Sequence, residues 1–326
     1  MRALAAVGLA LFVARTLAAA EPAPVFEVAV GGNGPIAGED ENLALFPVGG
    51  APASFAVDAD GRWWLLDAIG ARVLVIERDG TVARTIPFPA AGKEKGKEKR
   101  PTFRSDLELD GAGGLYVVDA TAHRIERWSK DGVRTWSVGS EKLPRGQGGL
   151  DLPQRVERIG ENLFVTDRGS ERLLRFTADG DYTSAVPGAR AAPIAGGGYA
   201  ILTGDIEATW LETTAAKGAH GKPVTKLAAA EGRTLHDVSL VGTTAAGDVV
   251  LALSEGSADA PDRVRIRLFD RAGAPRGELT LPYADDDATP IRRWRLTPSG
   301  SLAWFRVKNG RFQAFETVLP VPATSP

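Results

Sequence analysis

Three segments of the chain place an aspartate at the end of an apolar run and an arginine five residues later. A carboxylate in this position can accept backbone N–H groups of a turn and pair with a guanidinium. An Asp-Gly dipeptide, typical of a tight turn, follows each arginine. Because the pattern recurs, we assign these residues a structural role. The pairs are Asp67 with Arg72, Asp119 with Arg124, and Asp167 with Arg172.

Residues that break this repeat are better candidates for a binding site. They lie in the short hairpins after the aspartates and are Ile69, His123, Arg168 and Glu171. His123 could serve as a ligand or a base, and Arg168 could hold a carboxylate or phosphate with two hydrogen bonds. The alternatives are a solvated loop histidine and a surface ion pair. We predict that the four residues share one face that contacts a ligand or partner.

Signatures of catalysis and of cofactor binding are absent from the sequence. The histidines are His123, His220 and His236, and no HExxH, GxSxG, phosphate-loop or GxGxxG context occurs. The chain has no cysteine, which excludes disulfides, thiolate catalysis and Cys-ligated zinc or iron–sulfur centres. We therefore predict no catalytic residue, no metal and no cofactor. His123 and His236 still leave a lyase or hydrolase open.

The charge balance argues against one class of partner and suggests another. A formal net charge of −2 opposes nucleic-acid binding. A lysine-rich run over residues 93–100 could contact an acidic partner, or could be a solvated loop. Its basic residues are Lys93, Lys95, Lys97, Lys99 and Arg100.

The N-terminus has the pattern of a secretory signal peptide. Arg2 precedes an apolar run over residues 3–14, and small residues at 18–20 offer a cleavage site after Ala20. The run is too short for a bilayer, which needs about 20 apolar residues; an uncleaved anchor is the alternative. The alanine- and arginine-rich composition suggests a bacterium. We expect a mature protein in the periplasm or outside the cell, with no membrane insertion.

The Asp–Arg pairs belong to a longer repeat of about 50 residues. A glycine turn followed by a short apolar strand recurs six times, at Gly61, Gly114, Gly160, Gly198, Gly247 and Gly300. Short strands broken by Gly and Asp-Gly turns, without a helical period between them, fit four strands per repeat. This period and strand number predict an all-β, six-bladed β-propeller.

Both chain ends bear on the extent of the propeller. The segment 26–32 is expected to add an outer strand to the last blade, over residues 294–318, and so close the ring. We predict a signal peptide over residues 1–20, a single propeller over 21–319 and a disordered proline-containing tail over 320–326. The mature protein is expected to be monomeric by itself.

The repeat resembles that of the NHL family of six-bladed propellers. The resemblance rests on the aspartate, the arginine five residues on, the aliphatic residue after it and the Asp-Gly turn, and it covers residues 55–180. The family places Asn two residues before the arginine, where this chain has Gly70, Ala122 and Ser170. The resemblance implies the fold, but this departure argues against a shared ladder of side chains on the loops.

Together these features favour an exported, noncatalytic propeller that acts as a scaffold. Rigid strands present variable loops to another envelope protein or an extended ligand. One alternative is a lyase or hydrolase with a small-molecule site at the channel mouth. Another is a glycan-binding module that uses an exposed Trp136 or Trp210.

Overall fold

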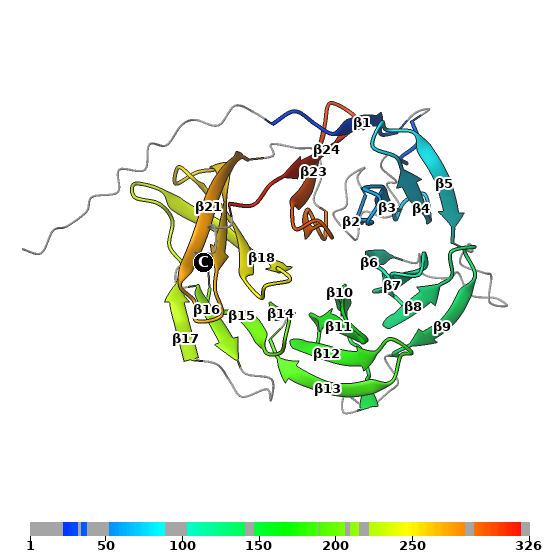
Figure 1. Ribbon diagram of the computed structural model, residues 1–326, viewed down its shortest axis with the longest axis horizontal. Coiled ribbons are helices and arrows are strands. Elements are labelled where there is room, and N and C mark those ends of the chain that lie inside the picture. The colour runs from blue at the N-terminus through cyan, green and yellow to red at the C-terminus, as the bar shows by residue number, and fades with distance from the viewer. Residues whose placement is uncertain are drawn as a thin grey trace, which may run out of the picture.

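Six four-stranded antiparallel sheets surround a central channel in the computed structural model of this chain (Figure 1). The structure describes residues 22–31, 34–37, 52–88, 103–140, 147–188, 190–205, 209–214, 222–283 and 290–320. Within these ranges the regular elements are strands, so the prediction of an all-β, six-bladed propeller is confirmed. The predicted signal peptide, the lysine-rich run and all but Pro320 of the predicted tail over 320–326 lie outside the described residues.

The strands of each blade run in sequence order from the channel outward. Blade one contains β2 (Ser54–Val57), β3 (Trp63–Asp67), β4 (Arg72–Ile76) and β5 (Val82–Pro87). Blade two contains β6 (Arg104–Leu109), β7 (Leu115–Asp119), β8 (Arg124–Trp128) and β9 (Arg134–Val138). Blade three contains β10 (Pro153–Ile159), β11 (Asn162–Asp167), β12 (Arg172–Thr177) and β13 (Tyr182–Pro187).

The second half of the ring has the same arrangement. Blade four contains β14 (Ala191–Pro193), β15 (Tyr199–Thr203), β16 (Trp210–Thr214) and β17 (Lys222–Lys226). Blade five contains β18 (Thr234–Thr243), β19 (Val249–Gly256), β20 (Pro261–Phe269) and β21 (Pro275–Pro282). Blade six contains β22 (Trp294–Leu296), β23 (Leu302–Lys308) and β24 (Arg311–Thr317), and its outer strand is β1 (Phe26–Ala29).

Ring closure depends on the N-terminal strand, as predicted. β1 pairs antiparallel with β24, with Phe26 opposite Ala314 and Ala29 opposite Arg311. The Phe26 ring packs edge-on against Trp63 of blade one at 5.6 Å and lies 6.0 Å from Phe312 of blade six. The first described strand therefore joins the last blade to the first and covers an edge that would otherwise be unpaired.

Burial on both sides of each blade explains the apolar runs in the second strands. All five residues of β3 are buried, and alternate side chains point to opposite neighbours. Trp63 and Leu65 pack in a cluster with blade six, whereas Trp64 and Leu66 pack with blade two. Every blade is thus an inner layer between two others, and the hydrophobic core is continuous around the ring.

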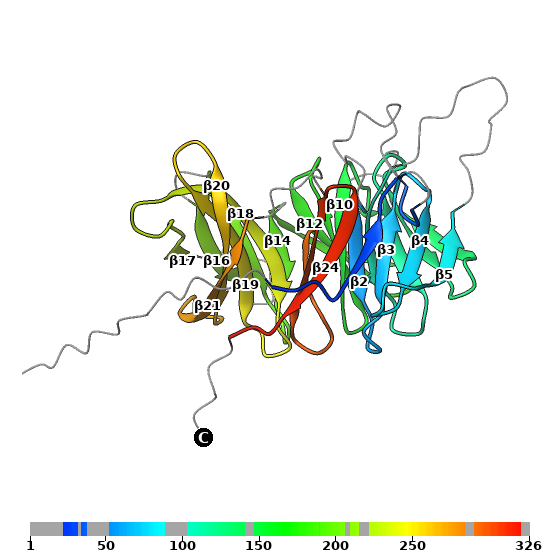
Figure 2. The same cartoon turned by 90° about the horizontal axis from the view of Figure 1, so that it is seen from above.

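Antiparallel pairing divides the turns between two faces of the ring. Turns between the first and second strands of every blade lie on one face, which we call face one. Turns between the second and third strands lie on the opposite face, which we call face two (Figure 2). A five-residue strand spans about 17 Å, so side chains on the two faces are well separated.

Blade five is longer than its neighbours. Its strands β18 to β21 contain 10, 8, 9 and 8 residues, whereas those of blade one contain 4 to 6. The polar stretch over residues 254–262 adds the ends of β19 and β20, so this hairpin projects beyond the ring on face two (Figure 2). His236 lies at its base, where Nε2 is 2.8 Å from the carbonyl oxygen of Ser257.

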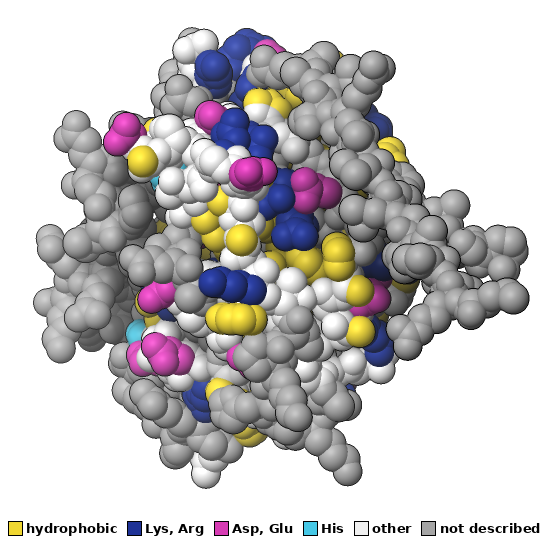
Figure 3. Space-filling model, turned by 90° about the vertical axis from the view of Figure 1, so that its left-hand side faces the viewer, with side chains coloured by type: hydrophobic (Ala, Val, Ile, Leu, Met, Phe, Trp, Pro, Cys, Tyr) yellow, Lys and Arg dark blue, Asp and Glu magenta, His cyan; other side chains and the backbone are white. Residues whose placement is uncertain are grey.

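Charges are mixed on the side of the molecule shown in Figure 3. Basic and acidic side chains are interspersed among the described residues there, without a broad region of one sign. On blade five, for example, Arg265 and Arg267 both pair with Glu278 at 3.3 Å. Among the described residues, the structure contains no helix with the length and apolar character needed to cross a membrane.

The closing strand generates a stability prediction. Phe26→Ala removes a ring that is 6% exposed and should lower the free energy of unfolding by about 3–5 kcal/mol. Urea denaturation monitored by tryptophan fluorescence measures the loss. Val133→Ala, at a side chain that is 61% exposed, is the control and should change it by less than about 0.5 kcal/mol. Equal effects of the two substitutions would show that β1 does not stabilise the ring.

Candidate functional site

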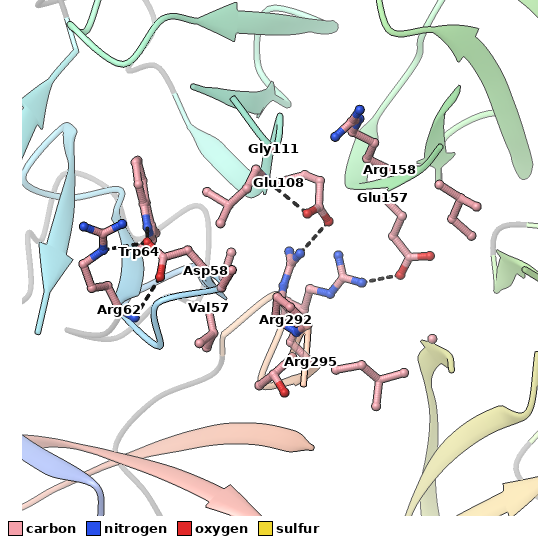
Figure 4. Close-up of a pocket in the computed structure, with 18 of the residues that line it drawn as sticks. Val57, Asp58, Arg62, Trp64, Glu108, Gly111, Glu157, Arg158, Arg292 and Arg295 are labelled. Atoms are coloured by element: carbon pink, nitrogen blue, oxygen red, sulfur yellow. Dashed lines mark hydrogen bonds and ion pairs between the residues drawn. The ribbon is translucent and has the colours of Figure 1, made fainter. Parts of the chain in front are cut away.

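The central channel opens on face one into a pocket of about 620 Å³. Its walls are the turns between the first and second strands of blades one, two, three, five and six (Figure 4). The volume lies in the range of small-molecule sites, about 300–1,000 Å³. Residues of five blades, from Ala56 to Pro298, thus line one cavity.

The pocket at the channel mouth is explained by the residues at one position of the inner strands, which is equivalent in all six blades. These residues pair across the sheet with Trp64, Tyr116, Phe164, Ala200, Val250 and Ala303 of the second strands. We call them the pocket ring: Ala56, Glu108, Glu157, Ala192, Gly242 and Arg295. Three members are charged and three are Ala or Gly, so the small side chains leave space beside the charged ones.

The charged members of the pocket ring are held by ion pairs. Arg295 Nη1 donates to Glu108 Oε2 at 2.6 Å, and Arg292 Nη2 donates to Glu157 Oε1. The other oxygen of Glu108 accepts the N–H of Leu109 at 3.0 Å. The two arginine side chains are only 4% and 7% exposed, whereas the two glutamates are 20% and 19% exposed. The carboxylates are therefore more accessible from the pocket than the guanidiniums that lie beside them (Figure 4).

A buried carboxylate lies beneath this ring. Asp106 is fully buried and accepts four hydrogen bonds from three other blades. The donors are Ser54 Oγ, the N–H of Val156 at 2.9 Å, Arg292 Nη1 at 3.1 Å and Arg295 Nη2 at 3.2 Å. Since a buried charge is tolerated only when it is paired and hydrogen-bonded, this set of donors is what permits Asp106 at the centre of the channel.

Burial and neighbouring charges shift the pKa values of the pocket floor. Burial raises the pKa of Glu108, and the positive charges of Arg295 and Arg292 only partly oppose it. Burial also lowers the pKa of Arg155, which donates to the carbonyl oxygens of Leu240 at 3.1 Å and Ile291 at 3.2 Å. For Arg292 burial acts in the same direction, but the surrounding carboxylates outweigh it and raise its pKa.

The wall from blade one is a second hydrogen-bonded group. Asp58 Oδ2 accepts from Arg62 Nε at 2.8 Å and from Trp64 Nε1 at 3.0 Å. Burial acts to raise the pKa of Asp58, but these bonds bring it below its ordinary value. The Trp64 ring is 4% exposed, and Arg84 lies over it at 4.9 Å from the centroid. Its face is therefore not available for stacking on a ligand.

The four site residues predicted from the sequence lie on face two, away from the pocket. Ile69, His123, Arg168 and Glu171 are in the turns that follow β3, β7 and β11. His123 and Glu171 occupy the same turn position as Ala71, and all three have a positive φ, of 53°, 52° and 48°. Arg168 and Glu171 are exposed, whereas Ile69 and His123 are half-buried. Turn geometry thus accounts for the placement of His123 and Glu171.

The repeated aspartates hold these same turns. Asp67 Oδ2 accepts from Arg72 Nε at 2.8 Å, and its other oxygen accepts the N–H of Gly70 at 3.0 Å. Asp119 accepts from Arg124 Nη2 at 3.1 Å and from the N–H of Ala122 at 3.0 Å in the same way.

Blade three varies this arrangement through Ser170, one of the positions where the NHL family has Asn. Arg172 Nε donates to Ser170 Oγ at 2.9 Å, and Ser170 Oγ donates to Asp167. The direct distance from Arg172 Nη2 to Asp167 Oδ2 is 3.8 Å. The hydroxyl therefore connects the arginine to the aspartate.

Other residues named from the sequence lie at scattered places. Trp136 and Trp210 are half-buried on blades two and four, and the Trp136 ring lies 5.8 Å from Tyr116. His236 is on blade five, and His220 falls outside the described residues. Among the described residues, no three His, Asp or Glu side chains are grouped so that they could hold a metal ion.

The charged residues of the pocket were not identified from the sequence, although one signal points to them. Glu108 and Glu157 are acidic residues in inner strands, each opposite an aromatic residue of the aligned repeats, Tyr116 and Phe164. Alignment of the first strands would have found these two. Arg295 lies in the sixth repeat, where the pattern is degraded, and its ion pair spans 187 residues.

Comparisons with known proteins agree on the fold alone. No protein-family profile and no curated protein matches the chain. A gluconolactonase from Xanthomonas campestris is 16% identical, with 95% of this chain and 99% of that chain covered at a TM-score of 0.52. Hydrazine synthase of Kuenenia stuttgartiensis is 14% identical, with 78% and 73% covered at a TM-score of 0.50. A virginiamycin B lyase from Staphylococcus aureus is 11% identical, with 82% and 95% covered at a TM-score of 0.49. The chain is a six-bladed β-propeller with a pocket at its axis.

Removing the charge at the centre of the channel should destabilise the whole ring. Asp106→Asn removes the carboxylate that Arg292 and Arg295 share, leaves each with a single ion pair to a glutamate, and should lower the free energy of unfolding by about 3–5 kcal/mol. Urea denaturation at neutral pH measures it. Asp179→Asn, at a side chain that is 86% exposed, is the matched control and should have an effect below about 0.5 kcal/mol. A similar small effect of Asp106→Asn would contradict the central role of this carboxylate.

The raised pKa of Glu108 predicts how stability depends on pH. Because the folded state binds this proton more tightly than the unfolded state, the contribution of Glu108 is full below its ordinary pKa of 4.5. This contribution of Glu108 to stability decreases as the pH rises through the raised pKa of the folded state. The stability of the wild type relative to Glu108→Gln should therefore fall between pH 4.5 and neutrality, as measured by urea denaturation of both proteins. If the stability of the wild type relative to Glu108→Gln rose over this range, the effect of Arg295 and Arg292 on the pKa of Glu108 would have to exceed the effect of burial.

Proposed function

We propose that this protein is an exported, NHL-like propeller of the bacterial cell envelope that binds a small polar ligand in its central pocket without transforming it. The observation that carries this proposal is the pocket floor, where Glu108 and Glu157 line a cavity and are fixed by ion pairs with Arg295 and Arg292. The signal-peptide pattern supports export, and the repeat frame over residues 55–180 supports the NHL-like assignment.

Preorganisation favours a binding role. Glu108 and Glu157 are already held by ion pairs with Arg295 and Arg292, so little side-chain ordering is needed when a ligand binds. The inner strands that carry these groups belong to six sheets closed into a ring, which resists movement of one blade relative to another. Rigid polar groups at the base of a cavity give a ligand orientation and specificity.

An enzyme remains the second candidate because of one observation. The pKa of Glu108 is raised by burial in the pocket, and a carboxyl group with a raised pKa can serve as a general acid in a hydrolase or lyase. The ion pair with Arg295 at 2.6 Å favours the ionised form instead and supports a binding role. The two candidates differ in whether the bound compound is recovered unchanged.

Two glycines allow a matched test of the pocket. Gly160 lines the pocket and Gly232 lies outside it, in the connection between blades four and five. Both have a positive φ, of 58° and 73°, and a Cβ added at either would meet no atom within 4 Å. Asparagine tolerates this backbone conformation better than most residues. Gly160→Asn therefore adds a side chain to the pocket, and Gly232→Asn is its control.

The experiment exposes the mature protein to a low-molecular-weight bacterial extract, removes free compounds by gel filtration and applies native mass spectrometry. We expect one small molecule per chain with the wild type and Gly232→Asn, and at least about a tenfold weaker retention with Gly160→Asn. Retention of nothing, or equal retention by both variants, would refute the pocket as a binding site. Conversion of the retained compound during incubation would favour the enzyme.

A further inference from the structure

We propose that the ligand of the central pocket is a neutral polyhydroxyl compound, a sugar or sugar alcohol, whose hydroxyl groups donate to Glu108 and Glu157. This inference rests on the proposed binding function and adds the chemical class of the ligand. It follows from which atoms face the cavity, from the charge of its lining and from the absence of an accessible aromatic ring on its described walls.

Hydrogen-bond acceptors dominate the accessible part of the floor. The glutamate side chains are 19% and 20% exposed, whereas those of Arg292 and Arg295 are only 4% and 7% exposed. An ionised carboxylate has about four acceptor positions on its two oxygens. The contacts from Arg295, Arg292 and the N–H of Leu109 occupy only some of these positions. A ligand that donates hydrogen bonds matches the rest.

The charge of the lining favours a neutral donor over a cation. The pocket is lined by four acidic and four basic side chains: Asp58, Asp60, Glu108, Glu157, Arg62, Arg158, Arg292 and Arg295. The buried groups below, Asp106 and Arg155, also balance. An ammonium group would compete with arginines already paired to the glutamates, whereas a hydroxyl group donates without adding charge. At the floor an anion would meet Glu108 and Glu157, which are more exposed than Arg295 and Arg292.

The shape of the pocket ring gives the ligand its place. Ala56 and Gly242 are the small members of the ring that line the pocket together with Glu108 and Glu157. A Cβ built on Gly242 would lie 3.8 Å from Glu157 Oε1, so the missing side chain leaves open space directly beside this carboxylate. A sugar ring placed there would bring a hydroxyl group to Glu157, and Glu108 of the neighbouring blade lines the same cavity.

The walls distinguish this site from one that recognises sugars by stacking. Trp64 lines the pocket, but its ring is 4% exposed and is covered by Arg84. Arg158 Nη1 donates to the carbonyl oxygen of Asp110 at 2.7 Å, which holds a guanidinium with further N–H groups at the wall. These groups can donate to hydroxyl oxygens, so the site offers both acceptors and donors. Recognition by hydrogen bonds is therefore expected to dominate.

The test uses saturation-transfer NMR and isothermal titration calorimetry on the mature protein. The neutral probes are D-glucose, D-galactose, maltose and sorbitol, and the charged analogues are D-glucosamine and D-gluconate. We expect at least one neutral probe to bind at least about tenfold more tightly than either analogue. Glu157→Gln and Glu108→Gln should each weaken it by about tenfold, the loss typical of one charge-assisted hydrogen bond. Glu231→Gln, at an exposed glutamate away from the pocket, should change it less than about twofold.

Each outcome decides the inference. Thermal melting shows whether the variants fold. If Glu108→Gln does not fold, the binding measurement on Glu157→Gln decides alone. The two substitutions are independent in that Glu157 pairs with Arg292, whereas Glu108 pairs with Arg295. Preferential binding of glucosamine or gluconate overturns the ligand class, as does failure of every neutral probe. Binding that is insensitive to Glu157→Gln overturns the site. If the extract ligand is retained in a Gly160→Asn-sensitive manner while these probes fail, only this inference is lost and the binding function stands.

Discussion

The buried carboxylate of Asp106 is the interaction on which the centre of this propeller depends. It accepts hydrogen bonds from blades one, three and six, and it is fully buried. Without those donors a charge at the axis would be strongly unfavourable, and without the carboxylate Arg292 and Arg295 would each keep only one ion pair, to Glu157 and Glu108. The ion pairs therefore connect inner strands that the sheets themselves do not join, since hydrogen-bonded sheets end at each blade.

The pocket is a consequence of this arrangement. Arg295 and Arg292 hold Glu108 and Glu157 at the pocket floor, while Ala56 and Gly242 leave space in the pocket ring. Six equal large side chains at these positions would have filled the channel mouth. The candidate site thus arises where the repeats differ from one another, in a fold whose stability arises where they are alike.

The two faces of the ring divide these roles in an informative way. On face two, Asp67 and Asp119 hold their turns by accepting backbone N–H groups and by pairing with arginines, and Asp167 holds its turn through Ser170. These aspartates repeat because the three blades have the same turn. His123 and Glu171 look exceptional by residue type, yet they occupy a common turn position with Ala71. On face one, the charged residues differ between blades because they face a shared space and complement each other across it.

The amino-acid sequence by itself determined the architecture, because its signals are local. Glycine turns, apolar second strands and the Asp–Arg spacing act within about 20 residues, and each recurs often enough to give the strand count and the ring. It also indicated that the segment 26–32 closes the last blade, which β1 does. The pairing of Asp67 with Arg72 is local in the same sense.

Only the tertiary structure decided the candidate site. Arg295 and Glu108 are 187 positions apart and meet only because the ring closes. Strand register determines which residue of an inner strand faces the channel. The register shifts within β6 and within β10, where the pairing is irregular. A charged residue in an apolar strand is ambiguous in sequence, since its burial depends on a partner from another blade. Closure of the ring supplies that partner, and with it the pocket.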